Sequence, residues 1–142
     1  MADGMKLHFP VNGDDFTRAG ETSSKVKKTL NQLGFNPEVV RKVAIAMYEG
    51  EINMVIHANG GDIDVEISPD EIIVVMKDVG PGIPDLDMAM TEGFSTADSS
   101  VRELGFGAGM GLPNMKKYSD SMDVQTEIGK GTTVTLKFSA HI

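Results

Sequence analysis

The sequence contains no cysteine and no long run of apolar residues. Without cysteine the chain can form no disulfide, use no thiolate as a nucleophile and bind no metal through sulfur, which fits a reducing compartment. No apolar stretch approaches the roughly 18 residues that a membrane-spanning helix needs. Residues 1–15 have neither a basic segment nor an apolar one, so we expect no signal peptide. Together these absences predict a cytoplasmic protein that does not bind a membrane.

Positive charge is scarce as well, because 13 lysines and arginines stand against 21 aspartates and glutamates, for a net charge of −8. Such a charge argues against direct binding to nucleic acid or to anionic membranes. A phosphate-bearing ligand would therefore have to be held by local cations, backbone N–H groups or a metal ion. With 142 residues, 40% of them apolar and 24% charged, the chain is expected to form a single globular domain over residues 1–142.

The spacing of apolar residues predicts both strands and helices. In chain order the expected elements are a strand at 6–11, a helix at 16–33, a helix from Pro37 to His57 or Ala58, strands at 62–68 and 72–76, a helix from about Leu112, and strands at 122–128 and 132–138. The continuous apolar run at 72–76 is typical of a central strand. We therefore expect an α/β (α+β) two-layer sandwich, with a mixed, mainly antiparallel sheet and helices on one face.

The second expected helix carries polar residues on an otherwise apolar surface. Glu49, Asn53 and His57 recur every four residues, which places them on one helical face. Because burial of an unpaired carboxylate is costly, these residues either have partners in a site or form a solvent-facing edge. Gly50, beside them, costs about 1 kcal/mol relative to alanine in a helix interior, which suggests close packing at that position.

A second candidate site feature is Asp78-Val79-Gly80-Pro81-Gly82-Ile83, directly after the apolar strand. An aspartate at the end of a buried strand can accept a hydrogen bond from an exocyclic amine such as that of adenine. Glycine in such a turn lets the backbone approach a flat ligand closely. Turns after strands often have this sequence, so the motif has little value without the others.

The third feature is Gly105-Phe106-Gly107-Ala108-Gly109-Met110-Gly111-Leu112, with glycine at every second position before a helix. Exposed backbone N–H groups and the positive end of the helix can bind an anion there. The segment has neither the Gly-Lys-Ser/Thr of a P-loop nor the Gly-x-Gly-x-x-Gly of a dinucleotide site. It is either a different phosphate-binding loop or a flexible glycine loop.

The fourth feature is Gly129-Lys130-Gly131-Thr132-Thr133, which taken alone predicts a hairpin turn.

In this order the four motifs resemble the ATP-binding (Bergerat or GHKL) fold shared by DNA gyrase B, Hsp90, histidine kinases and MutL, over about residues 36–139. Within that superfamily the chain looks most like the small anti-sigma factor serine kinases of bacteria. The residues that carry this resemblance are Tyr48-Glu49-Gly50-Glu51-Ile52-Asn53 with His57, and Gly109-Met110-Gly111-Leu112-Pro113-Asn114-Met115-Lys116. Relatives usually have alanine or another helix former where Gly50 stands.

The resemblance implies ATP and Mg²⁺ as ligands. Glu49 resembles the general base and Asn53 the Mg²⁺ ligand, while Glu51 is a second carboxylate that leaves the choice of base open. Asp78 resembles the residue that reads adenine, helped by Thr132 through water. Residues 82–104 resemble a lid. The remaining nucleotide-binding positions are Gly80, Gly82, Ile83, Gly105, Gly107, Gly109, Gly111 and Leu112. The cations that either add positive charge at the phosphates or are simply solvated are Arg102, Lys116 and Lys130.

The expected function is that of an ATP-dependent serine/threonine protein kinase of the anti-sigma type. It would bind a sigma factor or similar target and phosphorylate an antagonist protein, as a monomer or a homodimer. The alternative is an ATP-binding regulatory module with little or no transfer. A histidine kinase would need a pair of phosphoacceptor helices, and a gyrase-like ATPase would need transducing domains, neither of which we expect in 142 residues.

Overall fold

The computed structural model describes residues 5–12, 20–56, 60–80 and 111–140. In these ranges the elements are, in chain order, β1 (Met5–Asn12), α1 (Glu21–Gln32), α2 (Pro37–Ile56), β2 (Gly60–Ile67), β3 (Glu71–Asp78), α5 (Gly111–Tyr118), β4 (Ser121–Glu127) and β5 (Gly131–Ser139). Each element expected from the sequence is present. The first helix begins at Glu21, later than expected, because Gly20 directly before it has a left-handed backbone with a φ of +95°; residues 16–19 of the expected range lie outside the described residues. No helix in the described ranges is long and apolar enough to span a membrane.

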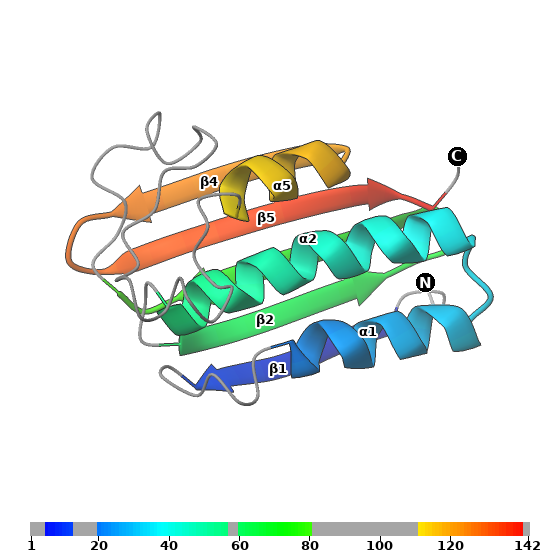
Figure 1. Ribbon diagram of the computed structural model, residues 1–142, viewed down its shortest axis with the longest axis horizontal. Helices are drawn as coiled ribbons and strands as arrows, with labels where there is room; N and C mark the ends of the chain where they lie inside the picture. Colours follow the sequence, from blue (N-terminus) through cyan, green and yellow to red (C-terminus); the bar gives the residue numbers. More distant parts are fainter. Residues whose placement is uncertain (1–4, 13–19, 57–59, 81–110, 141–142) are drawn as a thin grey trace, which may run out of the picture.

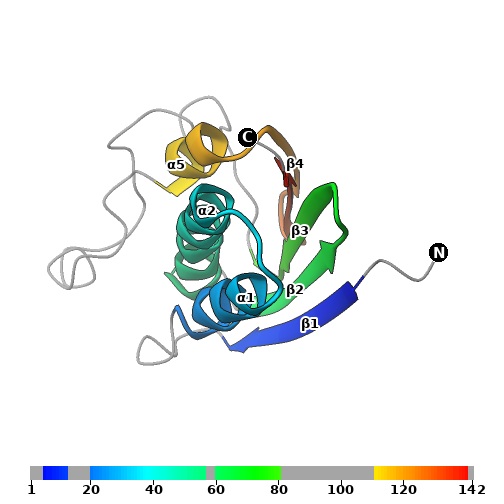
Figure 2. The ribbon, with the colours of Figure 1, turned by 90° about the vertical axis from the view of Figure 1, so that its right-hand side faces the viewer.

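The five strands form one sheet in the order β1-β2-β3-β5-β4, and all four pairings between them are antiparallel. The parallel component implied by a mixed sheet is therefore not found among the described strands. β3 lies at the centre, as its continuous apolar run predicts. Helices α1, α2 and α5 all cover the same face of the sheet, which confirms the two-layer sandwich (Figure 1; Figure 2).

The core lies between the two layers. Every second residue of β2, β3 and β5 is buried toward the helices, as expected for a sheet with one covered face. Helix α2 crosses the middle of the sheet and packs against α1 on one flank and α5 on the other (Figure 2). Three of its sides are therefore covered by protein, which explains why this helix is apolar on nearly every side.

Gly50 lies where α2 meets β3. A Cβ atom at this position would fall on the Sδ of Met76 and lie 3.3 Å from the Sδ of Met115. The close packing expected at Gly50 is confirmed. Because a side chain is absent here, α2 can approach Met76 of β3 and Met115 of α5 together.

Candidate functional site

The parts of the chain that carry the candidate residues meet at one end of the molecule. Helix α2 ends there, β3 ends there and β5 begins there, while α5 starts beside the second half of α2 (Figure 1). The register joins the end of β3 to the start of β5, with Lys77 opposite Thr133. Segments that are far apart in sequence are thus brought together, as the resemblance to the ATP-binding fold implies.

Glu49 and Asn53 lie one turn apart on α2, and both side chains are half-buried. The Oε1 atom of Glu49 accepts a hydrogen bond of 3.2 Å from the Nδ2 of Asn114 on α5. Glu49 is therefore not part of a simple solvent-facing edge, because it is partly covered and has a partner on another helix. His57, the third polar residue in this series, lies outside the described residues.

Glu51 has different surroundings, since its side chain is buried at 3% exposure. Its two carboxylate oxygens accept hydrogen bonds from the backbone N–H groups of Thr22 and Ser23, both at 3.1 Å. These N–H groups belong to the first turn of α1, whose N-cap residue, Gly20, has no side chain that could accept them. Glu51 thus caps α1 from α2, and its negative charge lies at the positive end of the α1 dipole.

The two carboxylates therefore differ in how many of their oxygens already accept a hydrogen bond from the described residues. Both oxygens of Glu51 are occupied by backbone donors. Glu49 has one oxygen bound by Asn114, and no residue in the described ranges donates to the other. Of the two, Glu49 is the carboxylate that can still accept a proton or a hydrogen bond from a ligand.

Asp78 is the last residue of β3, and its Oδ1 accepts a hydrogen bond of 2.8 Å from the backbone N–H of Thr132. Burial raises the pKa of its carboxyl above the ordinary value, although the hydrogen bond from Thr132 acts in the opposite direction. Gly131, beside it, has a φ of +141°, and a Cβ atom there would lie against the Asp78 carbonyl and 2.9 Å from Oδ1. Glycine is therefore required for β5 to approach Asp78 this closely.

Thr132 is buried, and its Oγ1 lies 2.9 Å from the Oγ1 of Thr126 in β4. Its link to Asp78 runs through the backbone N–H, so its help to Asp78 through water stays a prediction. Gly80 lies two residues after Asp78, and its backbone N–H donates a hydrogen bond of 3.4 Å to the Lys130 carbonyl. The turn after β3 is thereby held against the turn between β4 and β5.

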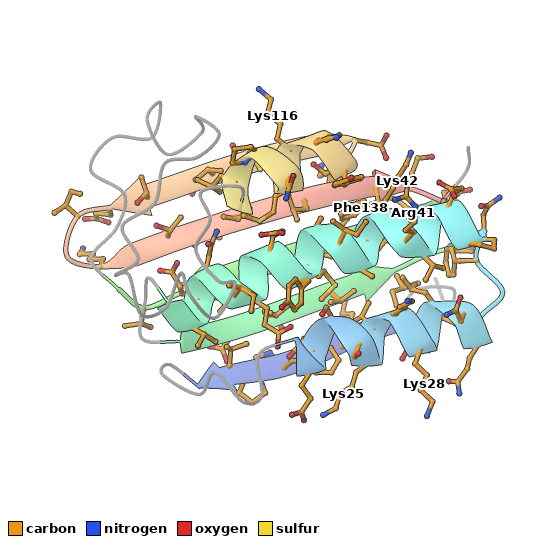
Figure 3. The ribbon with its side chains drawn as sticks, viewed as in Figure 1. Lys25, Lys28, Arg41, Lys42, Lys116 and Phe138 are labelled. Atoms are coloured by element: carbon orange, nitrogen blue, oxygen red, sulfur yellow. The ribbon has the colours of Figure 1, made fainter. Side chains whose placement is uncertain are left out.

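Two of the glycine-loop positions lie within the described residues. Gly111 begins α5, and Leu112 places its side chain in the core with 6% exposure, so a ligand would have to contact Leu112 through its backbone. The other candidate positions lie outside the described residues, namely Gly82, Ile83, Gly105, Gly107, Gly109 and the lid at 82–104. The exposed Lys116 points outward from α5 (Figure 3), and Lys130 pairs with Glu127 at 3.2 Å. These lysines fit the solvated alternative.

Within the described ranges, no group of three or more histidine, aspartate or glutamate side chains is arranged to hold a metal ion. A Mg²⁺ ion that arrives with a nucleotide needs no such group, because it keeps several waters and takes oxygens from the phosphates. The amide oxygen of Asn53, half-buried and one turn from Glu49, has the chemistry of a single additional ligand. The residues present therefore fit a nucleotide-bound Mg²⁺ ion.

Asn114 was not among the site residues inferred from the sequence, although it lies within the quoted motif. It is separated from Glu49 by 65 positions. No spacing rule connects two residues so far apart. Only the packing of α5 against α2 shows that they meet.

Comparisons with known proteins agree with this arrangement. Residues 43–142 match the family described as "Histidine kinase-, DNA gyrase B-, and HSP90-like ATPase". The serine/threonine-protein kinase RsbT of Bacillus subtilis is 30% identical over 112 residues, which cover 76% of this chain and 78% of that protein. The anti-sigma F factor of Geobacillus stearothermophilus is 29% identical over 143 residues, which cover 96% of this chain and 92% of that protein.

A solved structure shows the same fold. The crystal structure of the RsbU and RsbW domains of Rv1364c from Mycobacterium tuberculosis aligns with a TM-score of 0.62 at 13% identity, covering 94% of this chain and 31% of that chain. The family match includes Glu49, Asn53 and Asp78 together with α5 and the final hairpin. The chain belongs to the family of histidine kinase-, DNA gyrase B- and HSP90-like ATPases, which use ATP.

Proposed function

We propose that this protein is an ATP-dependent serine/threonine kinase of the anti-sigma type, which binds a sigma factor or similar target and phosphorylates an antagonist protein. The observation that carries the proposal is Glu49, a half-buried carboxylate one turn from Asn53 with only one oxygen bound by a described residue. A module that only held ATP would have no need of a carboxylate there. The names of two relatives, a serine/threonine-protein kinase and an anti-sigma F factor, support the two parts of the proposal.

In the proposed reaction Glu49 accepts the proton of a serine or threonine hydroxyl on the antagonist protein. The hydroxyl oxygen forms a bond to the γ-phosphorus, the bond from that phosphorus to the β–γ bridging oxygen breaks, and the electron pair leaves with ADP. Phosphoryl transfer depends on positioning and charge neutralisation more than on covalent chemistry. Glu49 lies on a helix that is fixed in the core, and this meets the need for positioning.

Asn53 would supply one amide oxygen to Mg²⁺, which when bound neutralises charge on the phosphates. This neutralisation matters in a chain with a net charge of −8. Asp78 would accept a hydrogen bond from the exocyclic amine of adenine, and the Thr132 N–H already orients its carboxylate. The glycine-rich sequence from Gly105 to Leu112 indicates a loop that would cover the phosphates through its backbone N–H groups.

The proposed partners are proteins, because a sigma factor and its antagonist both act through protein contacts in this type of regulation. We place the kinase in the cytoplasm with the transcription machinery that its target would serve. A homodimer is the assembly proposed for it, and sedimentation at several protein concentrations would test this.

The proposed function is tested by capturing partners of the purified chain from lysate of its source in the presence of ADP and, separately, of ATP. Each captured protein is then incubated with the chain and γ-³²P-labelled ATP. We expect label on a serine or threonine of one captured protein, and no label when Mg²⁺ is removed with EDTA. Tight binding of ATP without label on any partner would favour the regulatory module instead.

A further inference from the structure

The contact between Asn114 and Glu49 has no role in the function as proposed so far. The Asn114 side chain is half-buried on α5, and its amide donates to one oxygen of Glu49 at 3.2 Å. The donor is a neutral amide. A lysine or protonated histidine at this position would neutralise the Glu49 carboxylate, whereas an amide can orient it and leave its charge in place.

The position of Asn114 is fixed by the residues around it. Leu112 and Met115 on α5 are buried in the core, at 6% and 1% exposure. At the other end of α5, the Tyr118 ring lies with its centroid 5.8 Å from the Cζ of Arg41 on α2 and 5.4 Å from the Nζ of Lys117. Rotation of α5 that separated Asn114 from Glu49 would also expose the two core side chains and disturb this stack.

We infer that Asn114 is a positioning residue for phosphoryl transfer, which holds one oxygen of Glu49 so that the other faces the acceptor hydroxyl. This inference rests on the proposed function of Glu49 as the base. A glutamate side chain has several rotatable bonds, and a base contributes only in the orientation that reaches the proton. Asn114 fixes that orientation from a second helix and touches neither substrate nor proton.

A purely structural role of Asn114 and a positioning role predict different kinetic effects when the hydrogen bond is lost. If the hydrogen bond served only to pack α5 on α2, its loss would lower stability and weaken nucleotide binding along with turnover. A positioning role predicts a lower kcat with little change in KM for ATP or in ADP affinity. It also predicts that the loss disappears once Glu49 is removed, because the two residues act as a unit.

The test uses Asn114→Leu, which keeps the size of the side chain and removes the donor, and Asn114→Gln, which keeps an amide donor. Transfer is measured under single-turnover conditions, with ADP affinity by calorimetry and Tm by thermal unfolding. We expect Asn114→Leu to lower kcat by about ten- to a hundredfold, with ADP affinity within about twofold of wild type. Asn114→Gln should recover part of the loss. In a Glu49→Gln background, Asn114→Leu should have no further effect.

Several outcomes would overturn the inference while leaving the kinase proposal intact. They are full turnover in Asn114→Leu, an equal further loss in the Glu49→Gln background, and a loss in Asn114→Gln as large as that in Asn114→Leu at unchanged Tm. If Asn114→Leu does not fold, Asn114→Ala, which also removes the donor, decides the question by the same measurements. Absence of transfer by the wild-type chain itself would overturn the proposed function, and the role of Asn114 with it.

Discussion

The two flanks of α2 use the same kind of residue for different purposes. On the α1 flank, Glu51 is buried and gives both oxygens to backbone N–H groups. On the α5 flank, Glu49 is half-buried and gives one oxygen to the neutral amide of Asn114. The carboxylate with all its acceptors occupied stabilises the fold, and the one with an acceptor left over is available for chemistry. Two glutamates only two positions apart in sequence thus have different roles, because they have different hydrogen-bond partners.

The largest effect on transfer is expected from Glu49→Ala. As a general base, Glu49 contributes only when a hydroxyl attacks, so we expect transfer to fall by about 10²–10⁴-fold while ADP affinity and Tm stay near wild type. The matched control is Glu38→Ala, which removes an exposed carboxylate from the first turn of the same helix. Equal transfer by Glu49→Ala and wild type would remove Glu49 as the base.

Glu51→Ala should show the opposite pattern, with a loss of stability as its direct effect. Two backbone N–H groups of α1 would lose their acceptor in a buried place, which we expect to lower the free energy of unfolding by about 2–4 kcal/mol. Urea denaturation measures this loss, and faster hydrogen exchange at Thr22 and Ser23 should accompany it. A fall in transfer with unchanged stability would contradict this division of roles, because Glu51 would then share the role of Glu49.

Asp78 tests whether a half-buried carboxylate outside α2 is likewise available to a ligand. Asp78→Asn should weaken ATP and ADP alike, by about tenfold or more, since both carry adenine. Calorimetry of ADP binding checks this, and unchanged affinity would remove Asp78 from the site. His8, which is exposed on β1, offers a control through His8→Asn.

The same substitution has a second consequence for stability in the absence of nucleotide. Burial raises the pKa of the Asp78 carboxyl in the folded state, so the ionised form is disfavoured by folding. This cost is present above the folded-state pKa and disappears below the unfolded value. We therefore expect nucleotide-free Asp78→Asn to be more stable than wild type at neutral pH, with an advantage that shrinks as the pH falls through the raised folded-state pKa and is absent below the ordinary aspartate value of about 4. A constant difference across that range would contradict this assignment.

The smallest effect is expected from Gly50→Ala, between the two glutamates. Alanine would gain about 1 kcal/mol in helix propensity, but its Cβ would displace the flexible Met76 side chain at a cost of about 1–3 kcal/mol. The net change in the free energy of unfolding should therefore be a loss of no more than about 2 kcal/mol. The double variant Gly50→Ala with Met76→Val should lose less free energy of unfolding than the sum of the losses in the two single variants. A stability gain in Gly50→Ala alone would show that Met76 moves without cost.

The order and type of the described elements followed from local patterns, because alternation in β2 and the apolar run in β3 reflect burial directly. Asp78 was found as a site candidate because it directly follows that run. The roles of Glu49 and Glu51 could not be separated in the same way, because they depend on which helix lies on each flank of α2. Asn114 was missed for the same reason, since its contact joins residues 65 positions apart.

The sheet order also has a consequence for how the chain folds. β2 pairs with β3 and β4 with β5 as sequence neighbours, but β3 and β5 are distant in sequence, and the hydrogen bond from the Thr132 N–H to the Asp78 side chain at the end of their pairing joins residues 54 positions apart. Closing a loop of that length is slower than forming either hairpin. The contact that orients Asp78 therefore forms only when the two hairpins dock. In pulse-labelled hydrogen exchange, the amide of Thr132 should gain protection later than the amide of Lys130, which bonds within its own hairpin turn.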